Sequence, residues 1–394
     1  MVNKTNKKEI IDSALLAVLL FFPALNYYFA ESLYSFGMKN PLVQVIYFFV
    51  YVCGCICYAR YFANAFKYIL VTLFALMVSF LLTPGVFEAI TGPLFLQSLL
   101  CTFALVYIPI FLIVSNKSFN FETTFCYLYP IALMVVTICI VTYGIEVMTM
   151  SMLHEYMTFA YTGLPAILIT LYISTRKRHV LGMIISIIGS ATIVFGGCRG
   201  ALLTMIVFIG LMMLQNLKSS SNRYIIAGLI LLFVFNAETI MSFINDFLGS
   251  FGYESRIMTL FENEEAAESE GREAVYQKAF TLLDFIGHGV FSDRVLLEHV
   301  VDATYCHNWV IEFLVDYGYF IGGILVLLLL RVLIRFVVNR NQLSETGLFM
   351  LYFSICMLST KYMLSGSYLA SAEWSLILGW FTNSRTTLKS IIHE

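Results

Sequence analysis

Charged residues are scarce in this sequence of 394 residues. Asp, Glu, Lys and Arg make up 12% of the chain, whereas they make up about a quarter of an average soluble domain. Hydrophobic residues account for 60%, and the mean hydropathy is +0.84. These values predict an integral membrane protein.

Common catalytic motifs are absent as well. The sequence has no Walker loop, no Asp-x-Asp metal pair in a soluble domain, no His-Glu-x-x-His and no Gly-x-Ser-x-Gly. These absences exclude direct use of nucleotide energy and the zinc or serine hydrolase sites that such motifs build. The polar links "STRKRH" and "KSSSNR" are too short for a nucleotide-binding domain, and no tandem repeat, heptad pattern or low-complexity tract occurs.

The hydrophobic residues form runs of about 17 to 25, the length with which an α-helix crosses a bilayer, and not the short alternating segments of a barrel. We predict an all-α polytopic membrane protein of about twelve transmembrane helices, forming one membrane domain over residues 1–394. The predicted spans are 11–30, 41–59, 67–83, 94–115, 124–148, 161–175, 180–196, 200–217, 224–245, 308–336, 346–364 and 370–385. No small-residue cleavage site follows "MVNKTNKK", so we expect the first span to be retained.

The positions of the basic residues predict the orientation. With a cytoplasmic N-terminus, most of the 23 Lys and Arg fall in inside segments, which supports cytoplasmic placement of both termini. The basic residues left on the outer side are Lys39, Arg199, Arg256, Arg272, Lys278, Arg294 and Lys361. The nine cysteines lie mostly within apolar runs, where we read them as small apolar side chains and not as metal ligands.

One connection is long, and this topology places it outside the membrane. It covers residues 246–306, and a loop of this length in a compact protein is usually functional. An acidic cluster, "ENEEAAESEGRE", is followed by the amphipathic stretch "REAVYQKAFTLLDFIG". We predict a helix over the outer mouth of the bundle, with an apolar face formed by Val275, Phe280, Leu282, Leu283 and Phe285.

External arginines are the candidate anion-binding groups. Arg199 lies at an outer helix boundary beside Gly200, where the backbone can approach a ligand closely; the alternative is an arginine that extends to lipid headgroups. Arg256 and Arg272 are further candidates, since guanidinium forks suit the oxygens of a diphosphate. The alternative for both is a solvated charge paired with the acidic cluster.

His307 is the candidate general base, because histidine alone among side chains has an unperturbed pKa near neutrality. Asn308 and Glu312 follow it at the start of a span and are candidate substrate-binding residues. The alternative is that His307 and Asn308 only cap a membrane helix. His288, between two glycines, is read as a turn residue. Some of the carboxylates in or near spans should line a polar cavity; they are Glu146, Glu155, Glu238, Asp316 and Glu373.

Several of these stretches, over about residues 150 to 330, together resemble the O-antigen ligase and O-antigen polymerase superfamily of bacterial surface-glycan assembly. The stretches are "EYMTFAYTGLPAIL", "FGGCRGALL", "GREAVYQKAFTLLDFIGHG" and "CHNWVIEFLVDYGYFIGGILVLLL". Three motifs carry the resemblance: Arg199 followed by Gly200, Arg272 followed by Tyr276 and a Gly-x-Gly turn, and His307 followed by Asn308. Cys198 stands where a serine is usual, and Tyr276 where a tryptophan is common.

The resemblance implies a membrane-embedded glycosyltransferase of the bacterial cytoplasmic (inner) membrane. It would polymerise undecaprenyl-diphosphate-linked repeat units into O-antigen, capsular or exopolysaccharide, by inverting transfer without metal or cofactor. Arg199 and Arg272 would hold the diphosphate, and His307 would deprotonate the acceptor hydroxyl. Implied partners are the lipid-linked glycan, the bilayer, a chain-length regulator and a flippase, with no nucleic acid.

Two other functions remain open at this point. An O-antigen ligase uses the same donor but transfers it to lipid A core or another terminal acceptor. A polysaccharide transporter or flippase is the second, because about twelve spans with both termini inside is a common transporter arrangement. A disulfide between Cys198 and Cys306, both beside candidate site residues, is a further open alternative.

Overall fold

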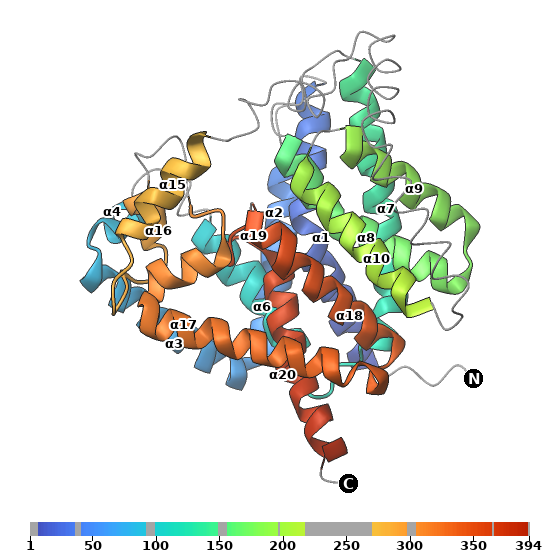
Figure 1. Ribbon diagram of the computed structural model, residues 1–394. Helices are drawn as coiled ribbons and strands as arrows, with labels where there is room; N and C mark the ends of the chain where they lie inside the picture. The colour runs from blue at the N-terminus through green and yellow to red at the C-terminus, as the bar shows by residue number, and fades with distance from the viewer. Residues whose placement is uncertain are drawn as a thin grey trace. The chain divides into compact units, whose positions relative to one another are not determined.

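The computed structural model describes residues 7–35, 41–91, 99–148, 156–195, 198–216, 270–297, 305–364 and 366–392. These residues are almost entirely helical, and no strand occurs among them (Figure 1). The predicted all-α class is therefore confirmed for the described part of the chain.

Six helices in the described residues are long and apolar enough to cross a membrane. They are Lys7–Tyr28, Phe62–Leu82, Phe121–Ile145, Thr158–Lys177, Trp309–Val338 and Glu345–Leu364. Shorter apolar helices cover four more of the predicted spans, at Gln44–Arg60, Leu99–Val114, Val180–Ile193 and Gly200–Gln215. The predicted span 224–245 lies outside the described residues, and 370–385 falls in a helix that is not among the six. The total of twelve stays a prediction.

The chain contains two compact units within the predicted single domain. Unit 1 comprises Met1–Asn26, Asn40–Leu128 and Glu270–Glu394, and unit 2 comprises Tyr27–Lys39 and Tyr129–Ser269. Two helices contribute to both units: α1 (Lys7–Ser35) and α7 (Phe121–Met148).

Unit 1 holds most of the described helices. In chain order its further elements are α2 (Pro41–Arg60), α3 (Phe62–Leu82), α4 (Gly85–Thr91), the π-helix η1 (Phe103–Tyr107), α6 (Ile108–Val114), α15 (Glu270–Thr281), α16 (Ser292–Leu296), α17 (Trp309–Val338), η2 (Arg340–Gln342), α18 (Glu345–Cys356), the π-helix η3 (Met357–Lys361), α19 (Tyr362–Leu364) and α20 (Ala372–Ile392). Helices α6 and α20 pack together, and α15, α16 and α18 contact α17.

Unit 2 contains a small helical core. Its helices α8 (Tyr156–Lys177), α9 (Val180–Phe195) and α10 (Arg199–Asn216) contact one another. The Tyr28 hydroxyl donates to the Phe159 carbonyl at 2.8 Å, which ties α1 to α8. Aliphatic side chains of α8, such as Leu164 and Ile167, are fully buried.

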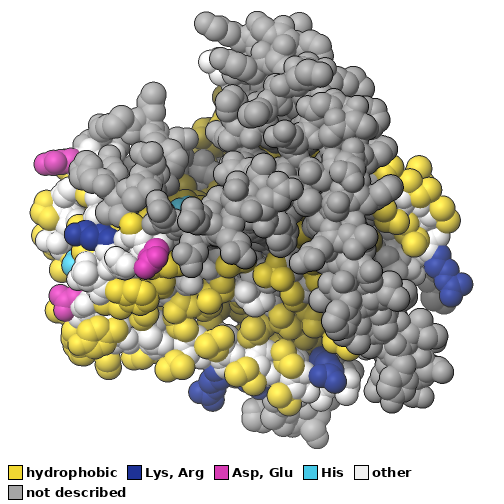
Figure 2. Space-filling view, turned by 45° about the horizontal axis from the view of Figure 1, so that its top comes forward, with side chains coloured by type: hydrophobic (Ala, Val, Ile, Leu, Met, Phe, Trp, Pro, Cys, Tyr) yellow, Lys and Arg dark blue, Asp and Glu magenta, His cyan; other side chains and the backbone are white. Residues whose placement is uncertain are grey.

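On the face that Figure 2 shows, the described part of the surface is largely apolar and few charged side chains are visible. On α3, Phe66, Leu70 and Phe74 are all more than 45% exposed, and on α17 the same is true of Leu327 and Ile334. Long helices that expose large apolar side chains fit lipid and not water as their surroundings. The helices thus indicate a membrane protein.

The predicted amphipathic helix in the long loop is present, but its buried face differs from the prediction. Helix α15 ends at Thr281, and its buried residues are Val275 and Ala279. Phe280 lies within the helix but is exposed, and Phe285 lies beyond the helix end and is exposed as well. Leu282 and Leu283 are partly buried, as expected. The external position of this loop stays a prediction.

Candidate functional site

A glycine turn is inserted into a break in α17. Gly318 has φ +74° and ψ +163°, so the helix is interrupted one-third of the way along. The turn supplies partners for the interrupted backbone: His288 N donates to Val315 O at 3.0 Å, Gly289 N donates to Asp316 O at 2.8 Å, and Tyr319 N donates to Asp284 O at 2.9 Å. Broken helices at membrane depth require such internal partners.

Only glycine fits on both sides of this junction. Gly287 has φ +82°, and a Cβ on it would lie 2.1 Å from Gly318 N. His288 sits between Gly287 and Gly289, and its Nε2 lies 2.8 Å from the Leu282 carbonyl oxygen. The reading of His288 as a turn residue is confirmed.

Directly after this turn, α16 brings a charged pair into the interior. Asp293 is fully buried and Arg294 is 5% exposed. Arg294 forms an ion pair with Asp293, and its Nη1 lies 2.8 Å from Oε1 of Glu312, which is also fully buried on α17. The resulting buried ion network joins α16 to the start of α17.

Residues of the segment before α20 complete the network. Ser367 accepts from Arg294 and donates to Glu312 Oε1 at 2.5 Å, while Tyr368 N donates to Glu312 Oε2 at 3.2 Å. The Tyr368 hydroxyl donates to Asp316 Oδ2 at 2.6 Å. Ser292 donates to the other Asp316 oxygen at 3.1 Å.

The network holds more carboxylates than cationic groups. One oxygen from each of Asp293, Glu312 and Asp316 lies within 4.8 Å of the other two, a spacing that a cation could use. Arg294 supplies the positive charge among them, and an uncompensated buried charge would be costly. Burial by itself lowers the pKa of Arg294, but the neighbouring carboxylates, Asp293 first, raise it above its ordinary value. Arg294 is therefore always charged.

His307 lies at the edge of this network, immediately before α17. Its φ is +53°, a left-handed conformation that histidine adopts more readily than most residues. The side chain is partly exposed, and its ring lies 4.2 Å, centroid to centroid, from the ring of Tyr305. The preceding amide, Cys306 N, donates to Asp293 Oδ2 at 3.3 Å, so the backbone here is bonded to the network.

Asn308 is the N-cap of α17. Its side chain accepts from Val310 N at 3.0 Å and from Ile311 N at 3.3 Å, and it donates to Met363 O at 3.3 Å. The capping alternative is thus correct for Asn308, and substrate contact by its side chain stays a prediction. Glu312 is engaged by Arg294, Ser367 and Tyr368, so its role in this structure is to support the network.

Helix α15, which carries Arg272 and Tyr276, packs beside the His307 turn. Val275, Ala279, Leu297, Cys306 and Val315 form one buried hydrophobic cluster. The Cys306 thiol is free, so it forms no disulfide. Burial first, and then the negative charge of Asp293, raises the pKa of Cys306 above its ordinary value.

A second buried ion pair joins η3 to α20. Lys361, the last residue of η3, places Nζ 3.0 Å from Oε1 of Glu373 on α20. Ser371 bonds to Glu373 and to Tyr362. Glu373 and Asp316 are thus buried with polar partners, and the prediction that carboxylates near spans line a polar cavity stays a prediction.

The remaining predicted site residues are only partly described. Arg199 is the first residue of α10, followed by Gly200, in unit 2. Arg272 lies near the start of α15 in unit 1. The side chains of both arginines, and the whole of Arg256, lie outside the described residues. The structure therefore brings the backbone segments of Arg272 and His307 together and leaves convergence with Arg199 a prediction.

The sequence interpretation missed Asp293, Arg294, Ser367 and Tyr368. Arg294 was counted only as one of several external basic residues. A signal was present, since "VFSDRVLL" places an Asp-Arg pair between apolar residues directly after the Gly-His-Gly turn. Ser367 and Tyr368 carried no such signal, because only folding brings them to Glu312.

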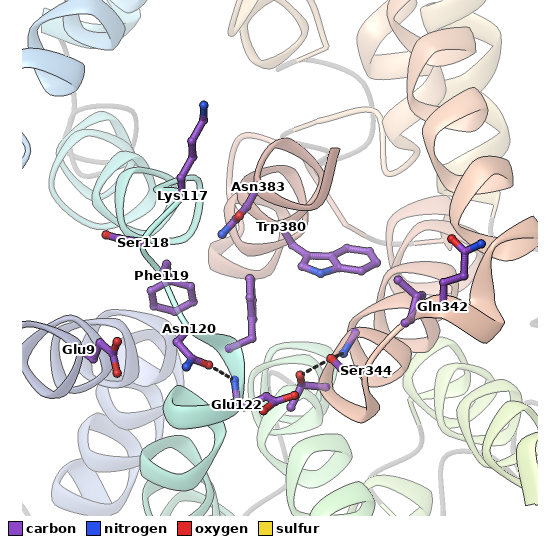
Figure 3. A pocket seen from close by; sticks show the side chains of 14 residues that line it. Glu9, Lys117, Ser118, Phe119, Asn120, Glu122, Gln342, Ser344, Trp380 and Asn383 are labelled. Atoms are coloured by element: carbon purple, nitrogen blue, oxygen red, sulfur yellow. Dashed lines mark hydrogen bonds between the residues drawn. The ribbon is translucent and has the colours of Figure 1, made fainter. Parts of the chain in front are cut away.

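A cavity of about 520 Å³ lies elsewhere in unit 1 (Figure 3). Its labelled lining residues are Glu9, Lys117, Ser118, Phe119, Asn120, Glu122, Gln342, Ser344, Trp380 and Asn383. The polar groups that border it serve partly as helix caps: Asn120 accepts from Glu122 N at 2.9 Å, and Ser344 accepts from Gly347 N at 3.2 Å. None of the predicted site residues whose side chains the structure describes lines it.

Comparison with known proteins adds no identity to this geometry. No protein-family model, no curated protein and no solved structure matches the chain.

Proposed function

We propose that this protein is a membrane-embedded glycosyltransferase that polymerises undecaprenyl-diphosphate-linked repeat units into a bacterial surface polysaccharide. The supporting observation is that Val275 and Cys306 belong to one buried cluster. Val275 is three residues after Arg272, and Cys306 directly precedes His307. Two residues of the proposed catalytic set thus lie on segments that pack together, although 34 other residues separate them in the chain.

The proposed reaction is an in-line displacement at the anomeric carbon of the donor. His307 takes the proton of the acceptor hydroxyl as its oxygen bonds to that carbon. The bond between the carbon and the diphosphate oxygen breaks, and undecaprenyl diphosphate leaves with the electron pair. Arg272 and Arg199 stabilise the negative charge on this leaving group, and the configuration inverts.

The orientation and partners belong to the same proposal. The site faces the outer side of the cytoplasmic membrane, where lipid-linked repeats arrive through a flippase, and both termini are cytoplasmic. A chain-length regulator is the expected protein partner. The polymerase is favoured over the ligase because the acidic stretch before α15 would repel phosphorylated lipid A core.

The test is elongation of purified lipid-linked repeat by the purified protein in detergent, followed as a ladder of products. We expect elongation without added metal or nucleotide sugar. His307→Ala and Arg272→Ala should abolish it, whereas Lys278→Ala, an exposed cationic residue on the same helix as Arg272, should not.

Other outcomes would identify the alternatives. Transfer only after lipid A core is added would indicate a ligase. Movement of the lipid-linked glycan across liposomes without any linkage would indicate a transporter. Full elongation by a correctly inserted His307→Ala protein would refute the proposal.

A further inference from the structure

Tyr305 links His307 to the buried ion network. Its ring centroid is 4.2 Å from that of His307, and the two planes are tilted by 41°. The same ring lies 5.7 Å from the guanidinium carbon of Arg294. One aromatic side chain thus contacts both the proposed base and the buried arginine.

Arg294 cannot move freely, which makes it a fixed support for that ring. Asp293, Glu312 and Ser367 hold the guanidinium, and Phe291 lies 5.6 Å from it. A guanidinium packed against an aromatic face is favourable, and more so in buried surroundings. The position of the Tyr305 ring is therefore coupled to the ion network.

The backbone of the His307 turn is held by the same network. Asp293 pairs with Arg294 through one carboxylate oxygen and accepts from Cys306 N at 3.3 Å through the other. On the far side of His307, Asn308 caps α17. The left-handed conformation at His307 is thus held between two anchored neighbours.

We infer that Tyr305 and Arg294 are positioning residues for His307, with the guanidinium locating the Tyr305 ring and that ring locating the imidazole. This inference rests on the proposed function, in which His307 is the general base. A base held out of line with its acceptor loses rate, and misplacement by about 1 Å can cost about 100-fold.

Variants of Tyr305 separate positioning from simple packing. Tyr305→Phe keeps the ring and removes the hydroxyl, whereas Tyr305→Leu removes the ring. We expect Tyr305→Leu to lower kcat by about 10- to 100-fold with little change in KM, and Tyr305→Phe to retain most of the rate. Tyr319→Leu is the control, because Tyr319 is exposed on α17 and its ring packs against Phe285, and this variant should match the unaltered protein.

A second measurement reports on His307 without any enzymatic reaction. The rate of His307 modification by diethyl pyrocarbonate, followed by mass spectrometry of the folded full-length protein, depends on how the imidazole is packed. We expect a several-fold change in Tyr305→Leu and none in Tyr305→Phe. Arg294→Lys retains the charge but loses the planar fork, so it should also change the rate of His307 modification. If Tyr305→Leu does not fold, this variant tests whether the ion network positions His307.

The outcomes distinguish this inference from the proposed function. If His307→Ala is inactive, but folded Tyr305→Leu keeps both its kcat and its His307 modification rate, the inference is wrong and the proposed function stands. Unchanged His307 modification in folded Arg294→Lys would overturn the role of Arg294. If His307→Ala elongates substrate normally, the proposed function and the inference fall together.

Discussion

The two ends of α17 use polar side chains in opposite ways. At its N-terminal end, Glu312 in the first turn forms an almost completely buried ion network with Asp293 and Arg294 of α16. After its last residue, the chain borders the open cavity of Figure 3, where Gln342 and Ser344 are exposed. Polar groups at the cavity end cap helices or are exposed. Burying several charges at the other end costs free energy, and destabilising features of this kind are typical of functional sites.

Removing the buried cation should have the largest effect on this contrast. Arg294→Met leaves Asp293, Glu312 and Asp316 without their counter-charge, and we expect a loss of about 3 to 5 kcal/mol in stability. Arg340→Met, an exposed arginine at the other end of α17, should change stability by less than about 0.5 kcal/mol. Thermal unfolding in detergent measures both. Equal midpoints for the two variants would contradict the structural role given to Arg294.

The break in α17 should tolerate no side chain. A Cβ on Gly318 would lie 2.3 Å from Phe285 O, in a backbone conformation that essentially only glycine adopts. Gly318→Ala should therefore cost about 2 to 4 kcal/mol. Gly323→Ala is the matched control on the same helix, because nothing lies within 4 Å of its Cβ position, and it should stabilise the helix by about 0.5 to 1 kcal/mol. The two thermal midpoints should therefore move in opposite directions.

Two capping asparagines allow a finer comparison, since Asn308 caps the start of α17 and Asn120 lines the cavity beyond the other end. Asn308 and Asn120 each accept from the amides two and three residues ahead, but Asn308 also donates to Met363 O. Asn308→Ala should cost about 1 to 2 kcal/mol, and the exposed Asn120→Ala about 0.5 to 1 kcal/mol. A larger loss for Asn120→Ala, measured by the same unfolding experiment, would reverse the proposed order.

The smallest expected effect is a difference in reactivity between the thiols of Cys306 and Cys126. Cys306 is fully buried with a raised pKa, whereas Cys126, near the cavity end of α7, is exposed. From pH 7 to 9, N-ethylmaleimide should modify Cys126 and leave Cys306 unmodified until the protein is unfolded in detergent, as peptide mass spectrometry will show. Rapid labelling of native Cys306 would contradict its burial.

The sign of the pH effect on Cys306 follows from the raised pKa. The folded state favours the neutral thiol, so its contribution to stability is fully present below the unfolded pKa of about 8.5. It is lost as the pH rises through the folded value. Cys306→Ala should therefore reduce the loss of stability at alkaline pH.

Hydropathy located the apolar helices well, because a membrane helix must be long and continuously apolar whatever it packs against. It could not locate the break at Gly318, since a glycine within an apolar run is compatible with an intact helix. The apolar pattern also misassigned Phe280, which lies on an exposed part of α15, and Phe285, which follows the helix end at Thr281.

Within the site, sequence by itself determined local chemistry. It identified His288 as a turn residue from its flanking glycines, and it identified a histidine and a capping asparagine before α17. Only the tertiary structure brought Asp293, Arg294 and Glu312 together with Ser367. The reason is physical: a cap or a turn is satisfied by atoms a few residues away, whereas a buried charge is satisfied by partners that only long-range packing can supply.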